Sequence, residues 1–152
     1  MELSRDLSDY HHLVSNMFKW PTHPSEWEQY RLTDEQVEFF NEFGYLHNIK
    51  LLNESQLDQL RNELISIMDS KSDKFDLFYE FHSNESADPD KVIFHCLGHW
   101  RITPGFHDVN WNPAFVMAAY QLLGQKGVRF WHDQLFCKPA KHGGVVAWHQ
   151  DY

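Results

Sequence analysis

The last 25 residues of the chain contain the pattern that most limits its fold. Two segments rich in Val and aromatic residues, 128–138 and 145–151, are separated by residues 139–144, which include a proline and two adjacent glycines. Val and aromatic residues favour strands, and Pro and Gly between them favour a turn. The pattern predicts two neighbouring strands, and therefore a fold that includes a sheet.

Helix signals lie earlier in the chain. Thr33 and Gln36 have the spacing of a capping box, and Gly44 can end the helix that follows. Asn112 followed by Pro113 is typical of the start of another helix. With the periodic apolar residues after Asn53, these signals predict helices at 32–44, from 53 to about 70, and at 112–124. The apolar face of the last helix is expected to comprise Phe115, Met117, Ala118 and Leu122 or Leu123.

The order of the elements indicates the fold class. Further short strands are expected at 45–49, 77–81 and 92–96, so that helices come first and strands gather toward the end of the chain. This order is typical of an α+β domain. Residues 1–31 contain aromatic residues without a clear period and are interpreted as an irregular arm that packs over the core. Residues 32–152 would form the domain itself.

Composition excludes several classes of protein. The chain of 152 residues is 42% apolar with a formal net charge of −9, which suits one globular domain and lacks the basic surface that nucleic acids bind. No run approaches the roughly 18 apolar residues of a membrane span, and charges near the N-terminus interrupt any signal peptide. Cys96 and Cys137 are interpreted as free thiols of a reducing compartment. We expect a soluble cytoplasmic protein with no nucleic-acid and no membrane partner.

The candidate metal ligands are His149 and Asp151. Residues two apart in a strand point to the same side, so this imidazole and this carboxylate would face one way. Together they would form two thirds of the 2-His-1-carboxylate set that holds Fe(II). A hydrogen-bonded surface pair at a strand end is the alternative. His95, His99, His107 and His142 lie in no metal-binding spacing and are expected to be core or surface histidines.

The segment that carries these residues, from Val128 to Tyr152, resembles the phytanoyl-CoA dioxygenase family of Fe(II)- and 2-oxoglutarate-dependent oxygenases. Residues 32–45 also resemble the opening helix and strand of that family. The resemblance implies N-terminal helices packed on the first strands of a double-stranded β-helix, a jelly-roll or cupin-like fold. It implies that His149 and Asp151 are iron ligands, and that Gln134 and Lys138 contact 2-oxoglutarate. Fe(II), 2-oxoglutarate and O2 would be the cofactor and co-substrates.

The activity implied by the resemblance is hydroxylation of a small organic substrate that the sequence does not identify. A carboxylate at Asp151 favours hydroxylation or desaturation, because halogenating relatives have a small residue at this position. The family pattern continues with a second histidine ligand and an arginine that pairs with 2-oxoglutarate. We therefore expect the 152 residues to be the N-terminal part of a hydroxylase, incomplete in fold and inactive alone.

Two alternatives remain open from the sequence. The chain could be a non-catalytic binding or interaction module derived from the same fold. It could also be a different metal enzyme that completes its site with His132, His142 or a residue of a partner chain. The sequence does not determine the oligomeric state.

Overall fold

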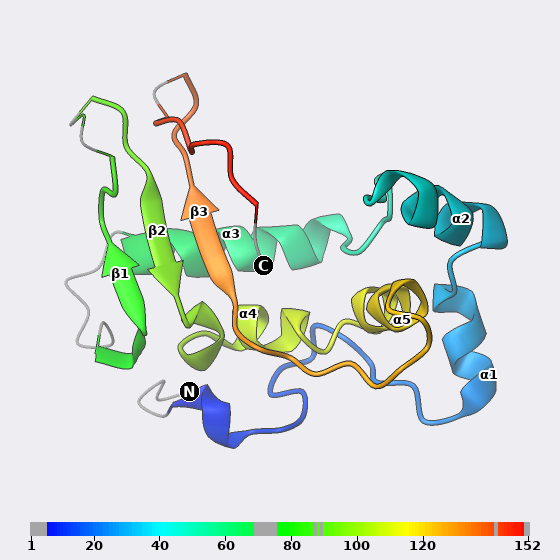
Figure 1. Ribbon diagram of the computed structural model, residues 1–152. Helices are drawn as coiled ribbons and strands as arrows, with labels where there is room; N and C mark the ends of the chain where they lie inside the picture. The colour runs from blue at the N-terminus through cyan, green and yellow to red at the C-terminus, as the bar shows by residue number, and fades with distance from the viewer. Residues whose placement is uncertain (1–5, 69–75, 87, 89, 142, 151–152) are drawn as a thin grey trace.

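The computed structural model describes residues 6–68, 76–86, 88, 90–141 and 143–150. A small sheet lies at one end of the molecule, helices α1, α2 and α5 lie at the other, and the long helix α3 runs between them (Figure 1). The elements in chain order are η1 (Leu7–Asp9), α1 (Pro24–Trp27), η2 (Glu28–Tyr30), α2 (Asp34–Phe43), α3 (Glu54–Met68), β1 (Glu80–His82), β2 (Phe94–Leu97), η4 (His99–Arg101), α4 (Pro104–Val109), α5 (Pro113–Leu122) and β3 (Gln134–Cys137). The segment interpreted as an irregular arm thus contains three short helices: η1, α1 and η2.

The sheet is antiparallel with the strand order β1-β2-β3. Each observed strand overlaps one predicted strand, at 77–81, 92–96 and 128–138, although the observed strands are shorter. The α+β class is confirmed. A closed double-stranded β-helix is not present among the described residues.

Two predicted strands are wrong. Residues 45–49 form no strand, and neither do residues 145–150, the described part of the segment 145–151. A pattern of alternating side chains defines two faces, but a strand also needs a hydrogen-bonded neighbour. Val145 is 89% exposed and Trp148 is 104% exposed, so packing does not hold this segment in a sheet.

The predicted helix boundaries follow from local capping. Thr33 Oγ1 accepts a hydrogen bond from the Gln36 amide at 3.3 Å, and Gln36 Oε1 accepts one from the Thr33 amide at 2.9 Å. This confirms the capping box of α2, and Gly44 ends the helix in the left-handed region with φ of 79°. At α5, the Asn112 side chain accepts a hydrogen bond from the Ala114 amide at 2.9 Å.

The short helix α4 was not predicted, because its cap comes from a distant element. The Glu63 carboxylate, on α3, accepts hydrogen bonds from the amide of Gly105 at 2.9 Å and from that of Phe106 at 3.3 Å. These amides belong to the first turn of α4 and have no partner within the helix. Without this contact, Pro104 followed by Gly105 is typical of a turn.

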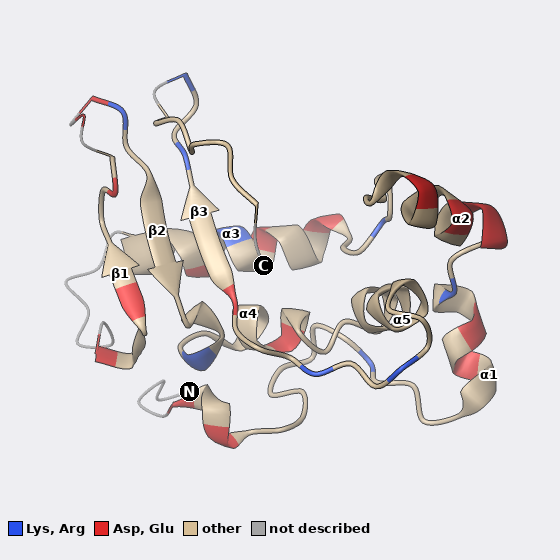
Figure 2. Cartoon of the chain, in the orientation of Figure 1, with Lys and Arg blue, Asp and Glu red and all other residues tan. Residues whose placement is uncertain are grey.

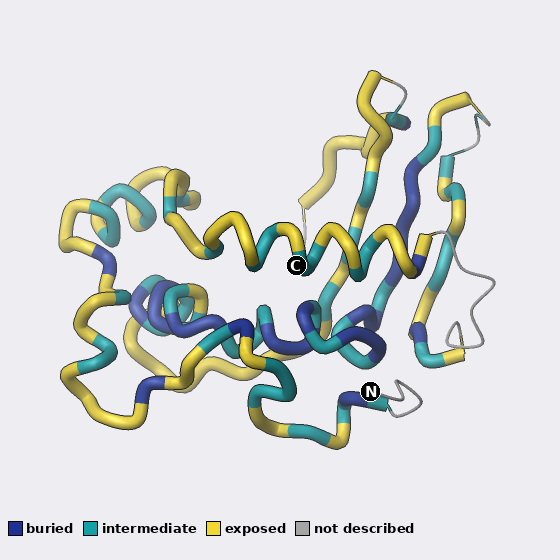
Figure 3. Tube along the Cα trace, turned by 180° about the vertical axis from the view of Figure 1, so that it is seen from behind, coloured by how far each residue is buried: buried dark blue, intermediate teal, exposed yellow. Residues whose placement is uncertain are grey.

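One face of the sheet forms the core. Helix α3 lies behind the sheet in Figure 1 and in front of it in the reverse view of Figure 3. The buried cluster comprises Ile67, Phe78, Phe94, Cys96 and Ile102, and Leu64, Leu77, Phe81, Leu135 and Cys137 pack against it. Both cysteines are free, as predicted. Burial, with the negative charge of Asp133, raises the pKa of the Cys96 thiol to about 12.

The face of α5 that packs inward differs in part from the prediction. Met117 and Ala118 are buried, but Phe115 is 46% exposed and Leu123 is 59% exposed. The buried sector instead includes Gln121, whose side-chain amide accepts from the Leu32 amide at 2.8 Å and donates to the Leu32 carbonyl at 3.2 Å. A buried polar residue that satisfies both backbone groups of a neighbour is not visible in an apolar pattern.

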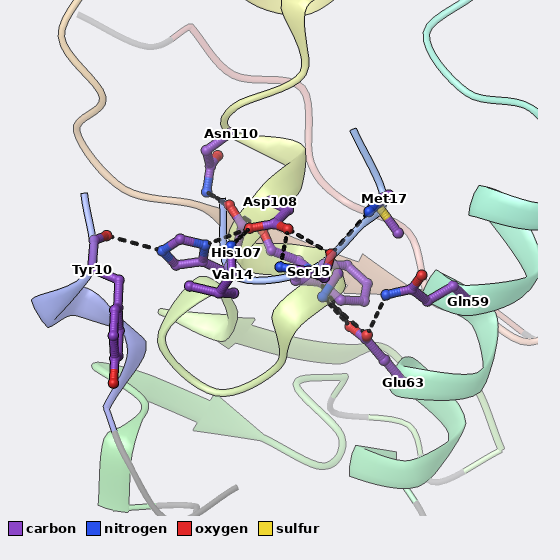
Figure 4. Close-up of polar contacts among 11 residues, drawn as sticks. Tyr10, Val14, Ser15, Met17, Gln59, Glu63, His107, Asp108 and Asn110 are labelled. Atoms are coloured by element: carbon purple, nitrogen blue, oxygen red, sulfur yellow. Dashed lines mark hydrogen bonds and ion pairs between the residues drawn. The ribbon is translucent and has the colours of Figure 1, made fainter. Parts of the chain in front are cut away.

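The N-terminal segment is tied to α4 by a buried carboxylate (Figure 4). Asp108 is 0% exposed and accepts hydrogen bonds from the amides of Val14 and Ser15 at 2.9 and 2.8 Å. His107 Nδ1 lies 2.9 Å from Asp108 Oδ1, and its Nε2 lies 3.1 Å from the Tyr10 carbonyl oxygen. Burial raises the pKa of Asp108, but hydrogen bonds from His107, Ser15 and Val14 outweigh it, so that the pKa lies below its usual value.

The charged side chains are distributed over separate elements. Figure 2 shows acidic residues along α1 and α2, whereas the Lys and Arg residues of the described chain lie apart from one another on several segments. No helix in the described part of the chain is long and apolar enough to cross a membrane.

Candidate functional site

The face of the sheet opposite α3, here called the open face, carries the polar side chains of interest. By the alternation of side chains along a strand, it comprises Glu80, His82, His95, Leu97, Gln134 and Phe136. The register aligns these residues in two rows across the sheet: Glu80, Leu97 and Gln134 in one, and His82, His95 and Phe136 in the other.

Gln134, one of the two residues predicted to contact 2-oxoglutarate, is exposed on this face. Its side-chain nitrogen lies 2.9 Å from His95 Nε2. An amide nitrogen only donates, so this contact requires a lone pair on His95 Nε2. His95 is 3% exposed and stacks between the rings of His82 and Phe136, at centroid distances of 5.8 and 4.4 Å. A rigid histidine therefore orients the Gln134 amide.

Sequence reasoning missed this role of His95. His95, His99 and His107 are buried, with 3%, 0% and 1% of their surface exposed, in agreement with core histidines, and His142 lies outside the described residues. The contact of His95 with Gln134 depends on the pairing of β2 with β3, which joins residues 39 positions apart. The pairing of these two strands cannot be predicted from the spacing of residues along the chain.

Lys138, the other residue predicted to contact 2-oxoglutarate, directly follows β3 and is exposed. The turn after it packs closely, because a Cβ atom at Gly143 would lie 2.7 Å from Lys138 Cβ. A larger residue at Gly143 would displace the start of the Lys138 side chain. Gly143 thus lets the turn close over the base of this side chain while the lysine stays exposed.

The start of β3 is fixed by Asp133, which the sequence did not single out. Its carboxylate accepts hydrogen bonds from the amides of Gly98 and Trp100 at 2.9 and 2.8 Å. Burial raises the pKa of this carboxyl group, although these hydrogen bonds oppose the shift. Because Asp133 immediately precedes Gln134, the same contacts hold Gln134 in register.

His149 lies in the exposed segment that follows the Gly-Gly turn, the red end of the chain in Figure 1. Its Nδ1 lies 2.9 Å from the carbonyl oxygen of Ala147. A carbonyl oxygen only accepts, so Nδ1 carries the proton and the lone pair of the neutral ring is on Nε2. Asp151 lies outside the described residues, so its position beside His149 stays a prediction.

The structure therefore joins the predicted site residues only in part. It places Gln134 against His95 and Lys138 at the end of the same strand. Gly144 packs near the start of β2, since a Cβ there would lie 2.7 Å from Ile93 Cδ1, and this contact leads the C-terminal segment back to the sheet. Histidine, amide, lysine and carboxylate are the groups that would bind a metal ion together with a small dianion.

Comparison with known proteins identifies the family. The family model for Phytanoyl-CoA dioxygenase (PhyH) matches residues 40–152, and the chain belongs to this family. The family is in general one of Fe(II)- and 2-oxoglutarate-dependent oxygenases with a cupin fold. No curated protein matches the chain.

Proposed function

We propose that this chain supplies part of the active site of an Fe(II)- and 2-oxoglutarate-dependent hydroxylase that acts on a small organic substrate. His149 and Asp151 are the iron ligands in this proposal, and Gln134 and Lys138 bind 2-oxoglutarate. The family match over residues 40–152 spans all four positions.

The observation that carries the proposal is the contact of the His149 ring with the Ala147 carbonyl oxygen. Histidines that bind a metal through one ring nitrogen commonly donate the proton of the other to a backbone carbonyl or carboxylate. The contact of His149 Nδ1 with the Ala147 carbonyl, at 2.9 Å, has this form and makes Nε2 the coordinating nitrogen. The side chain is also exposed, so a metal ion can reach it.

The residues of the sheet suit the co-substrate. 2-Oxoglutarate is a dianion, which Lys138 attracts by its charge and Gln134 binds through the N–H groups of its amide. His95 contributes by fixing the Gln134 side chain before the co-substrate arrives. The chemistry supplied by the bound iron is the activation of O2, coupled to decarboxylation of 2-oxoglutarate and hydroxylation of the substrate. A carboxylate at Asp151 favours hydroxylation over halogenation in this proposal, because halogenating relatives have a small residue at this position.

Chelation of Fe(II) by 2-oxoglutarate tests the proposal, since the chelate has a visible charge-transfer absorption. Fe(II) is added to the chain without oxygen, followed by 2-oxoglutarate, and the absorption is recorded. We expect the band in the wild type and its loss in His149→Ala and Asp151→Ala. Lys138→Met keeps the band but raises the Kd of 2-oxoglutarate about tenfold, as expected for the loss of roughly 1.4 kcal/mol of charge-assisted binding.

His11→Ala is the matched control, because His11 is an exposed histidine outside the proposed site. It should leave the band and the Kd unchanged. A band of equal strength in the wild type and in His149→Ala would contradict the assignment of His149. The absence of any band that depends on 2-oxoglutarate would contradict the binding of iron and 2-oxoglutarate proposed for this chain.

A further inference from the structure

We propose that Glu80, His82 and His95 form a second metal site on the open face, which binds a divalent transition ion of the Zn²⁺ type. One ligand atom from each residue lies within 4.8 Å of the other two. The site is distinct from the His149 and Asp151 pair, and it uses residues of β1 and β2 only.

The sheet itself brings the three ligands together. His82 and His95 are directly paired across β1 and β2, and Glu80 lies two residues before His82 on the same face. The two imidazole rings are parallel, with an angle of 6° between their planes and 5.8 Å between centroids. Glu80 Oε1 lies 2.8 Å from His82 Nε2. A cross-strand histidine pair with a nearby carboxylate thus projects from two adjacent, hydrogen-bonded strands.

The distances require only a small adjustment to bind an ion. Tetrahedral ligands about 2.0–2.1 Å from zinc lie roughly 3.3 Å from one another. The side chains of His82 and Glu80 are 42% and 46% exposed, so they can rotate toward His95. His95, buried between two rings, provides the fixed ligand around which the others close.

His95 already has the protonation pattern of a ligand. The Gln134 amide nitrogen faces Nε2 at 2.9 Å, which places the lone pair on Nε2 and the proton on Nδ1. The Glu85 carboxylate lies 3.0 Å from Nδ1 but off the line of a hydrogen bond, so Nδ1 has no hydrogen-bond partner among the described residues. A hydrogen bond from the second ring nitrogen to a carboxylate usually supports a metal-binding histidine, and a rotation of the Glu85 side chain would supply one. Coordination through Nε2 would replace the contact with Gln134, so His95 cannot bind this ion and orient the Gln134 amide at the same time.

The donor set selects the class of ion. Two imidazoles and one carboxylate suit Zn²⁺, Co²⁺ and related transition ions, whereas Mg²⁺ and Ca²⁺ prefer oxygen ligands alone. Without a metal, the same residues would be a surface ion pair between Glu80 and His82 beside a core histidine. The two accounts differ in whether His82 and Glu80 determine metal affinity.

Calorimetric titration of the metal-free 152-residue chain with Zn²⁺ distinguishes a metal site from a surface ion pair. The background is His149→Ala, which removes the other predicted site. We expect this variant to bind one Zn²⁺ at the open face, with affinity reduced at least tenfold by adding His82→Ala or Glu80→Gln. Adding His11→Ala, which removes an exposed histidine elsewhere, should change nothing. Excess Mg²⁺ should not compete.

Nitrogen-15 NMR of the histidine rings gives an independent result that does not rely on a variant of the buried His95. Zn²⁺ should shift the Nε2 resonances of His82 and His95 together in the His149→Ala chain. Unchanged affinity in His82→Ala and Glu80→Gln would overturn the proposal, as would unshifted resonances at saturating Zn²⁺. Either result would leave the function proposed for His149 and Asp151 unaffected.

Discussion

At the scale of single residues, His99 shows how burial changes the chemistry of a side chain. It is 0% exposed and lies against Phe106 at a centroid distance of 4.0 Å. Its Nε2 contacts Thr103 Oγ1 at 3.3 Å, while Nδ1 has no hydrogen-bond partner within the described chain. Burial lowers the pKa of His99 to about 4, so the neutral ring is the form that the fold accepts.

This pKa predicts a loss of stability in mild acid. Between pH 6.5 and pH 4 the unfolded chain binds a proton at His99 that the folded chain does not bind, so stability decreases as the pH falls through this window. The shift corresponds to roughly 3 kcal/mol. His99→Phe keeps an aromatic ring against Phe106 and should flatten the dependence. Urea unfolding at pH 7.0, 5.5 and 4.5 measures it, with His11→Ala as the control, and an equal slope in His99→Phe would refute this role.

At the scale of elements, α4 depends on α3 for its first turn. Glu63 accepts hydrogen bonds from the amides of Gly105 and Phe106, and a Cβ atom at Gly105 would lie 2.6 Å from Glu63 Oε2. Glu63→Ala should lower the free energy of unfolding by about 1–2 kcal/mol, as the loss of a helix cap does. Glu42→Ala, on the exposed surface of α2, is the control. Thermal unfolding at neutral pH is the measurement, and equal effects of the two substitutions would contradict the capping role.

The helices and strands also differ in how well the sequence predicts them. The capping box of Thr33 and Gln36 and the cap at Asn112 involve residues within three positions of each other, so α2 and α5 were predicted near their observed bounds. The cap of α4 comes from Glu63, 42 positions before Gly105. Strand 145–151 was predicted from its Val and aromatic residues and from the turn before it, but these signals do not supply a partner strand. Interactions between residues close in the chain can be predicted from a single sequence, whereas pairings between distant segments cannot.

The residues of the candidate site were also predicted only in part. Gln134, Lys138 and His149 were chosen from a motif and a family resemblance, and the structure places the first two along one strand. His95, which touches Gln134, and Asp133, which holds the start of β3, were not chosen. Their roles arise from register and burial, which become visible only when β2 and β3 are paired.

At the scale of the whole molecule, Asp108 joins Val14 and Ser15 of the N-terminal segment to the middle of the chain. Asp108→Asn removes a buried charge that accepts from two backbone amides and from Ser15 Oγ. We expect a loss of about 2–4 kcal/mol, because the donors of the buried network lose a charged partner. The amides of Val14 and Ser15 should exchange with deuterium faster. Asp90→Asn, at an exposed position, should leave exchange at these amides unchanged, and unaltered protection in Asp108→Asn would contradict the link.

The proposed function depends above all on the binding of iron by His149 through Nε2. Two-dimensional ¹H–¹⁵N NMR of the histidine rings tests it most directly, with Zn²⁺ as a diamagnetic substitute for Fe(II). We expect His149 to carry its proton on Nδ1 before metal is added. Zn²⁺ should then shift the Nε2 resonance of His149 in the wild type but not in Asp151→Ala at the same Zn²⁺ concentration. A proton on Nε2, or an unshifted His149 resonance at saturating Zn²⁺, would contradict it.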